Sequence, residues 1–488
     1  MKNLNKIFIL GFLLASLTAC VDDKITTDPS ATLSFSCDTL SFDTLFTNVP
    51  SRTLSFYVYN RNRQAVVISS VRLGNGADSY FRYNFDGRIP SSESKMLENI
   101  EIGGRDSLCV FVEITVDSTH RDVPVFYIDS MIFVTNGVTQ DVKLVSYGQD
   151  AIVLEDAEIA HDETFTAQRP YLIFGNLHVA SDATLTLEAG TRLYFHSKAN
   201  LVVDGHLQSL GTLENPVEMR TDRFDCQPDE DRTPYSDMPG QWGGIYLQNA
   251  HGAHTINHTK IRNCDIGLVV VGTSIAQPSL TLTNSVLHSM TQYGLYAQNA
   301  KVQVSNCELS NCGTSCCYLL GGEMNMAHTT VANYYTWGSR EDAAMVIANY
   351  AIDGSLLYLF PIQSAVVENS IIFGNQSSEL SLLRDTITDA AFNVTISRSL
   401  LKKRRQTTSW YNDNLWANSQ NPDASGIAHA DTVFLSTSRT DGGYDFRLDQ
   451  QSKARGKANI DVARLYPTDM LGQSRLADGA PDLGAYEK

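Results

Sequence analysis

A repeat of about 22 residues runs through the middle of the chain and restricts its fold more than any other feature. The pattern reads apolar, any, apolar, any, Asn, small, any, apolar. Its small position recurs at residues 264, 285, 307, 329, 350, 370 and 399. Because the repeat consists of short alternating runs without a helical period, it predicts coils of about three β-strands stacked at roughly 4.8 Å. Such coils form a right-handed parallel β-helix.

Equivalent positions of stacked coils form columns along the axis of a β-helix. One predicted aliphatic column consists of Ile266, Leu287, Leu309, Val331, Ile352, Ile372 and Leu401. A predicted ladder of amide side chains consists of Asn263, Asn284, Asn306, Asn349 and Asn369. These amides can bond from coil to coil and pair with backbone groups at a bend. A polar binding track is the other interpretation of the same residues, and we favour the structural ladder.

The region before the repeat is also β-rich. Between residues 31 and 150, short runs such as 54–59 and 108–114 alternate apolar and polar residues, and Asn136-Gly137 marks a hairpin turn. Strands at this spacing predict a β-sandwich. The region resembles the immunoglobulin-like modules of bacterial surface lipoproteins, which implies a spacer or scaffold role. The predicted fold class is therefore all-β.

The N-terminus carries an export signal. Lys2 and Lys6 precede an apolar run at 7–17, which is too short to cross a bilayer as a helix. The sequence Leu17-Thr18-Ala19-Cys20 resembles the lipobox of bacterial lipoproteins. This resemblance implies that residues 1–19 are removed, that Cys20 is acylated and that residues 20–30 form a tether. Several acyl chains would make the membrane a firm partner of the chain.

Two acidic residues, Asp22 and Asp23, follow the expected lipidation site directly. They resemble the acidic export tag of Bacteroidota surface lipoproteins. This resemblance implies an outer-membrane protein, lipid-anchored and exposed on the cell surface. The alternative is that both acids simply belong to a solvated tether.

The β-helix region, residues 151–440, resembles the pectin-lyase-like superfamily. The resemblance lies in 185–219 and 242–247, which are similar to first coils of that class, and in the C-terminal segments 445–448 and 481–487. It implies that residues 441–488 cap the last coil. The superfamily contains lyases, hydrolases and non-enzymes, so the resemblance leaves activity open.

Several classes of function lack support in the sequence. The chain has 37 Lys and Arg against 54 Asp and Glu, and a net charge of −17 argues against nucleic-acid binding. The Asn-Thr-Asp, Asp-Asp and Gly-His-Gly motifs of polygalacturonases are absent from the β-helix region, and no P-loop or Gly-x-Ser-x-Gly occurs. No catalytic residue is therefore assigned, although an enzyme remains an open alternative.

An acidic insertion is the leading candidate site. It carries Asp222, Asp225, Asp229, Glu230, Asp231 and Asp237, and it ends beside Trp242. Carboxylate oxygens suit calcium, and an aromatic ring at Trp242 could stack on a sugar. We therefore expect glycan or calcium binding here, with calcium the one cofactor considered and no firm metal site. The alternative is a solvated loop on an acidic protein.

Three functions follow from the sequence. The first is a surface lipoprotein with a non-catalytic β-helix that binds glycan or another cell-surface component. The second is a polysaccharide lyase or glycoside hydrolase, and the third is a structural envelope protein. The sequence leaves the oligomeric state undetermined.

Overall fold

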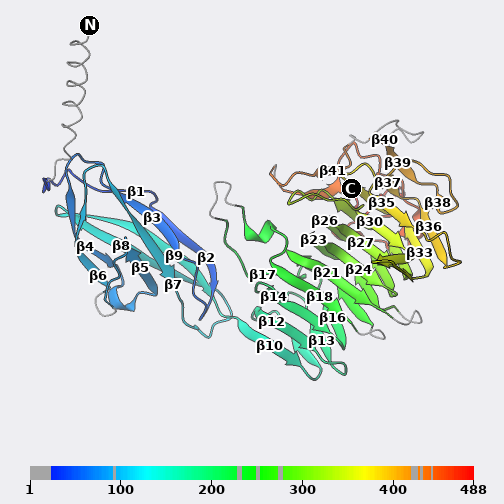
Figure 1. Ribbon diagram of the computed structural model, residues 1–488, viewed down its shortest axis with the longest axis horizontal. Helices are drawn as coiled ribbons and strands as arrows, with labels where there is room; N and C mark the ends of the chain where they lie inside the picture. Colours follow the sequence, from blue (N-terminus) through cyan, green and yellow to red (C-terminus); the bar gives the residue numbers. More distant parts are fainter. Residues whose placement is uncertain are drawn as a thin grey trace, which may run out of the picture. The chain divides into compact units, whose positions relative to one another are not determined.

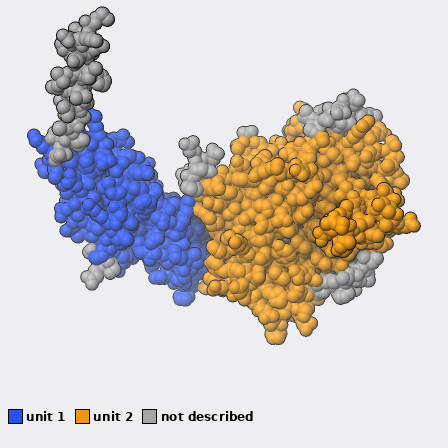
Figure 2. Space-filling model, in the orientation of Figure 1, with its two compact units in different colours: residues 1–151 blue, residues 152–488 orange. Residues whose placement is uncertain are grey.

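The computed structural model describes residues 24–91, 95–227, 233–248, 253–272, 278–418, 427–428, 432–440 and 443–488. It is nearly all-β, as predicted, and divides into two compact units, residues 1–151 and 152–488 (Figures 1 and 2). Asp22 and Asp23, with the expected signal and Cys20, lie outside the described residues. Within the described part, no helix has the length and apolar character needed to span a membrane.

The first unit consists of two packed sheets. The four-stranded sheet has the order β1 (Ser34–Phe35), β3 (Leu54–Tyr59), β7 (Ser107–Ile114), β5 (Phe81–Phe85). The five-stranded sheet has the order β2 (Thr39–Phe46), β9 (Val138–Gln149), β8 (Val125–Thr135), β4 (Val66–Leu73), β6 (Met96–Ile102). Residues of both sheets, including Phe56 and Phe133, share one buried core. This arrangement confirms the β-sandwich, while its kinship to immunoglobulin-like modules stays a prediction.

The second unit is a parallel β-helix that starts with two long strands, β10 (Ile152–Ile159) and β12 (Tyr171–Val179) (Figure 1). The later coils up to β36 each contribute strands to three stacks, which we call faces A, B and C in chain order. Face A contains β14 (Arg192–Phe195), β17 (Val217–Thr221), β20 (Thr259–Arg262), β23 (Val286–Met290), β26 (Glu308–Cys312), β29 (Thr330–Asn333), β34 (Ile371–Gly374), β37 (Leu400–Lys402), β39 (Leu415–Asn418) and β40 (Ile427–Ala428).

Faces B and C complete the coil. Face B contains β15 (Asn200–Val203), β18 (Trp242–Leu247), β21 (Cys264–Val271), β24 (Tyr293–Gln298), β27 (Ser315–Leu320), β30 (Met345–Ala348) and β35 (Leu380–Leu383). Face C contains β11 (Glu163–Phe165), β13 (Thr184–Leu187), β16 (His206–Leu210), β19 (His254–Asn257), β22 (Leu280–Thr283), β25 (Lys301–Ser305), β28 (Gly322–Ala327), β33 (Ile362–Glu368), β36 (Phe392–Ser397) and β38 (Tyr411–Asn412).

The aliphatic column of face A is mostly as predicted. Parallel pairing places five fully buried side chains in register, Ile261, Leu287, Leu309, Val331 and Ile372, with Leu401 next in line. Two predicted members are wrong. Ile266 lies on face B in β21, and Ile352 is 66% exposed in a hairpin that leaves the coil.

The predicted asparagine ladder is wrong as a single column. Asn284, Asn306 and Asn369 share the corner between faces C and A, with left-handed φ angles of 50–51°. Asn263, with φ 71°, lies between faces A and B, and Asn349 lies between faces B and C. The reason at the first four is that tight corners favour residues that tolerate the left-handed conformation, and Asn is prominent among them. Asn349 instead bonds through its side chain to Asp385 and Ala390. One residue type therefore recurs at corners that the sequence pattern cannot distinguish.

At the corner between faces C and A, side chains connect successive coils. The Asn306 amide donates to Asn284 Oδ1 at 3.3 Å, and the Asn284 amide donates to Asn257 Oδ1 at 2.9 Å. The neighbouring column of small residues also bonds between coils, because Ser285 Oγ accepts from the backbone N–H of Thr259 at 3.0 Å. These bonds satisfy backbone and amide groups that the corner would otherwise leave unpaired.

The C-terminal segment, residues 443–488, lies along the outward side of face A. Its described contacts extend over several coils and include Leu400 and Ala417 near the end of the β-helix, while capping of the last coil stays a prediction. Ala485 N–H donates to Thr330 Oγ1 at 3.0 Å, and Gly484 N–H donates to the Asn369 carbonyl at 2.8 Å. The segment contains β42 (Asp445–Leu448), paired with β41 (Phe434–Ser436), and the short helix α2 (Ile460–Ala463). It forms a separate buried core with outward side chains such as Ile371 and Phe373.

Asn306→Leu should destabilise the β-helix by roughly 2–4 kcal/mol. Asn306 bonds to Asn284, donates to the Thr468 carbonyl and accepts from Arg475, and leucine both removes these bonds and strains the left-handed backbone. Asn306→Gly is the matched control, since glycine keeps that backbone unstrained and should lose less. Urea unfolding provides the measurement, and equal midpoints for wild type and Asn306→Leu would contradict a structural role.

Candidate ligand-binding groove

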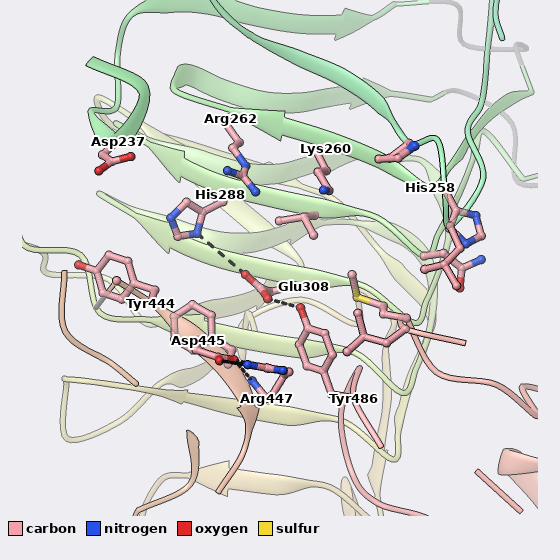
Figure 3. Close-up of a pocket in the computed structure, with 18 of the residues that line it drawn as sticks. Asp237, His258, Lys260, Arg262, His288, Glu308, Tyr444, Asp445, Arg447 and Tyr486 are labelled. Atoms are coloured by element: carbon pink, nitrogen blue, oxygen red, sulfur yellow. Dashed lines mark hydrogen bonds and ion pairs between the residues drawn. The ribbon is translucent and has the colours of Figure 1, made fainter. Parts of the chain in front are cut away.

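A groove of about 550 Å³ opens on the outward side of face A (Figure 3). Its floor is formed by β20, β23 and β26, one wall by residues around Asp237 of the acidic insertion, and the other wall by the C-terminal segment. The groove therefore joins segments that lie far apart in the sequence.

Strand alternation determines which side chains line the floor. Because Ile261, Leu287 and Leu309 point inward, their neighbours in each strand point outward. Parallel register then creates two outward columns. The first column contains Lys260, Val286 and Glu308, and the second contains Arg262, His288 and Ser310. Further along the axis the columns become less polar, with Thr330, Ile371 and Leu400 in the first column. The C-terminal segment covers this second part and leaves the charged part open.

Glu308 is the buried acid of the groove. Its carboxylate accepts a 2.8 Å hydrogen bond from Ser310 Oγ and a short one from the Tyr486 hydroxyl, which comes from the C-terminal segment (Figure 3). Burial raises the pKa of Glu308. Burial and the adjacent carboxylate raise the pKa of Tyr486 well above its usual range, so this hydroxyl stays protonated and acts as a donor.

His288 is a neutral imidazole at physiological pH. Its Nδ1 lies 2.7 Å from Ser310 Oγ and 3.9 Å from a carboxylate oxygen of Glu308. Burial, assisted by the positive charge of Arg262, lowers the pKa of His288 to about 3. The Tyr444 ring contacts it edge-on at 5.7 Å between centroids. His288 therefore offers the groove a hydrogen-bonding ring rather than a charge.

Two cations in the groove carry available charge. Lys260 and Arg262 project side by side from β20 (Figure 3), and in the described part of the chain neither side chain makes a hydrogen bond or an ion pair. Arg447, by contrast, is paired with Asp445, with 2.9 Å between Nε and Oδ1, and this bond lowers the pKa of Asp445. Arg439 lies over the Trp337 ring at 4.5 Å. The positive charges of the groove that make no hydrogen bond or ion pair with the described residues are thus concentrated on β20.

The acidic insertion does not gather its described carboxylates. Asp237 lines the groove, whereas Asp222 lies 2.7 Å from His196 Nδ1, where burial raises its pKa. Asp225 accepts two 2.7 Å bonds from Arg223. Three further acids of the predicted site, Asp229, Glu230 and Asp231, lie outside the described residues. Within the described ranges, no three metal-ligating side chains cluster, and calcium binding stays a prediction.

Trp242 is not available to a sugar. Its side chain is 1% exposed, stacks on Phe195 with 4.1 Å between centroids and donates from Nε1 to the Arg262 carbonyl at 2.8 Å. The prediction that it forms a binding platform is wrong, because Trp242 begins β18 at a position that points into the core. Tyr444, Phe446 and Tyr486 are the aromatic side chains that the structure places along the groove.

The sequence interpretation missed most of the groove. His288 becomes recognisable as a neighbour of Lys260 and Arg262 only when the strand register is known, because it lies on the next coil. The alternation in Thr259-Lys-Ile-Arg262 was the available signal, because an apolar residue between two cations indicates that both cations face outward.

Comparison with known proteins supports the fold. A family model described as a right handed beta helix region matches residues 243–441, which agrees with the parallel coils and gives their hand. No curated protein matches the chain. One solved structure, a family 123 glycoside hydrolase from Clostridium perfringens studied for glycolipid glycan hydrolysis, shares 7% identity at a TM-score of 0.18. The match covers 26% of this chain and 30% of that chain. So distant a likeness carries no argument about activity.

The neutral state of His288 predicts a loss of stability in acid. The unfolded imidazole titrates near 6.5 and the folded one near 3, so between these values only the unfolded chain gains the proton. Between pH 7 and pH 5 this residue should remove roughly 2 kcal/mol of stability. In His288→Gln this part of the loss in unfolding free energy should be absent, so the urea midpoint should fall less between pH 7 and pH 5 than it does in wild type. If the variant showed the same shift as wild type, the imidazole would not be buried and neutral.

Proposed function

We propose that this protein is a lipid-anchored protein of the outer membrane, displayed at the cell surface, whose β-helix binds an anionic glycan in the groove on face A. The observation that carries the proposal is the presence of two cations, Lys260 and Arg262, whose side chains form no hydrogen bond or ion pair with the described residues. They lie in a concave site that also offers Tyr444. The protein as a whole has a net charge of −17. A local concentration of positive charge on such a surface favours carboxylated or sulfated ligands over neutral ones.

Binding without cleavage is the leading form of this proposal. Both carboxylate oxygens of Glu308 accept hydrogen bonds from the protein itself, from Ser310 and Tyr486. This carboxylate thereby holds the C-terminal segment against β26. A group engaged in that way is poorly placed to exchange protons with a ligand.

Glycan cleavage by a lyase or hydrolase is the second candidate. The groove contains two carboxyl groups whose environments move their pKa values apart, since burial raises that of Glu308 and Arg447 lowers that of Asp445. Such a pair is what a general acid and its partner require in glycoside hydrolysis. A purely structural envelope protein is the third candidate, and it would bind no glycan in the groove.

The groove proposal is tested by Lys260→Gln with Arg262→Gln. The chain without residues 1–21 suits the experiment, because among the described residues the buried cores begin at Ala31. On a glycan array, wild type should bind carboxylated or sulfated glycans, with binding weakened by salt, and the double variant should bind them at least tenfold less.

The matched control is Lys453→Gln with Lys457→Gln, two exposed lysines outside the groove whose removal changes the net charge equally. Equal loss in both double variants would mean a diffuse charge effect and would contradict the groove site. Analysis of the same mixtures for shortened glycans separates cleavage from binding.

The anchoring part of the proposal rests on Cys20 and its lipobox-like context. Cys20→Ala removes the thiol that would carry the acyl chains, so the protein should move from the membrane fraction to the soluble fraction. Membrane fractionation followed by immunoblotting is the measurement, with Cys37→Ala as the control because Cys37 lies in the sandwich. Continued membrane partitioning of Cys20→Ala in an alkaline wash would refute the anchor.

A further inference from the structure

A two-stranded hairpin projects from the β-helix at the corner between faces B and C. It consists of β31 (Tyr350–Asp353) and β32 (Leu356–Leu359), which among the described strands pair only with each other. Its apolar side chains are open to solvent, with Ile352 66% exposed and Leu356 59% exposed. Solvent exposure of so many large apolar groups in one element is unfavourable and marks a contact surface.

Both faces of the hairpin carry large apolar side chains, and the acid Asp353 lies on the same face as Leu356. Residues directly opposite in an antiparallel pair share a face, and successive residues alternate. The pair Ile352 and Leu357 therefore lies on one face, while Tyr358, opposite Ala351, lies on the other with Leu356. A flat protein surface could cover only one of these faces. Immersion in an apolar medium covers both.

The exposed apolar surface continues onto the next coil. Leu383, the last residue of β35, is 37% exposed, and Ile387 in the segment that follows is 87% exposed. Asn349, the residue just before the hairpin, holds this segment in place. Its Oδ1 accepts from the Asp385 N–H at 2.7 Å, and its amide donates to the Ala390 carbonyl at 3.2 Å. The hairpin and this segment thus leave the same corner of successive coils.

We propose that this corner, the hairpin with Leu383 and Ile387, contacts a lipid bilayer. Leucine and isoleucine side chains enter the acyl region, while Tyr350 and Tyr358 suit the interface because their rings are apolar and their hydroxyls polar. The outer edges of the hairpin leave backbone groups unpaired, which restricts insertion to the headgroup boundary where water remains. The acid Asp353 beside the turn and the negative net charge favour zwitterionic over anionic lipids.

This inference is independent of the glycan groove and of the anchor at Cys20. The test uses the chain without residues 1–21 and vesicles of phosphatidylcholine and phosphatidylethanolamine. Wild type should float with the vesicles in a density gradient. Leu356→Ser with Leu357→Ser should weaken partitioning at least tenfold for each leucine, since burial of one such side chain is worth that factor.

Leu465→Ser with Leu476→Ser is the matched control, because both leucines are exposed elsewhere in the unit. Its flotation should equal that of wild type, and unchanged melting temperatures should show that all variants fold. Failure of wild type to float, or equal flotation of the hairpin variant, would overturn the proposal. Self-association that depends on Leu356 and Leu357, measured by light scattering without lipid, would assign the hairpin to contacts between copies and would also overturn it.

Discussion

The parallel pairing of each coil with the next is the interaction on which the second unit depends. Pairing in register aligns the inward-pointing residues of successive coils in columns. An apolar residue at each inward position therefore builds a continuous core. The same pairing leaves no room for inserted residues inside the strands. Insertions therefore leave at corners, as the hairpin at Tyr350–Leu359 and the acidic insertion after Thr221 both do.

The same pairing creates columns on the outside, and their chemistry determines where the C-terminal segment lies. On face A the outward residues change from Lys260 and Arg262 to Ile371 and Phe373 within a few coils. Exposure of the apolar part to water would be unfavourable, and the C-terminal segment buries it in a shared core. The groove is the place where this cover ends above charged residues, with Tyr486 and Glu308 at its border.

The repeat made the β-helix predictable, because its period and alternation are local properties of the sequence. The corner assignments were less predictable, since Asn263, Asn306 and Asn349 satisfy the same local pattern at three different corners. Trp242 was misjudged because proximity to an acidic loop says nothing about which way a strand residue points. The groove joins β20 to a segment some 180 residues later, from Lys260 to Tyr444, and no repeat encodes such a contact.

The topology of the coil keeps the two proposed contact surfaces apart. Each coil runs through faces A, B and C, and the hairpin leaves the corner between B and C, the one corner that face A does not share. The groove lies on face A, so lipid bound at the hairpin corner does not need to cover it. The two surfaces also differ in physical character, since one depends on charge that salt screens and the other on apolar area that salt leaves intact. Raising the ionic strength should therefore weaken glycan binding while preserving lipid binding in the same molecule.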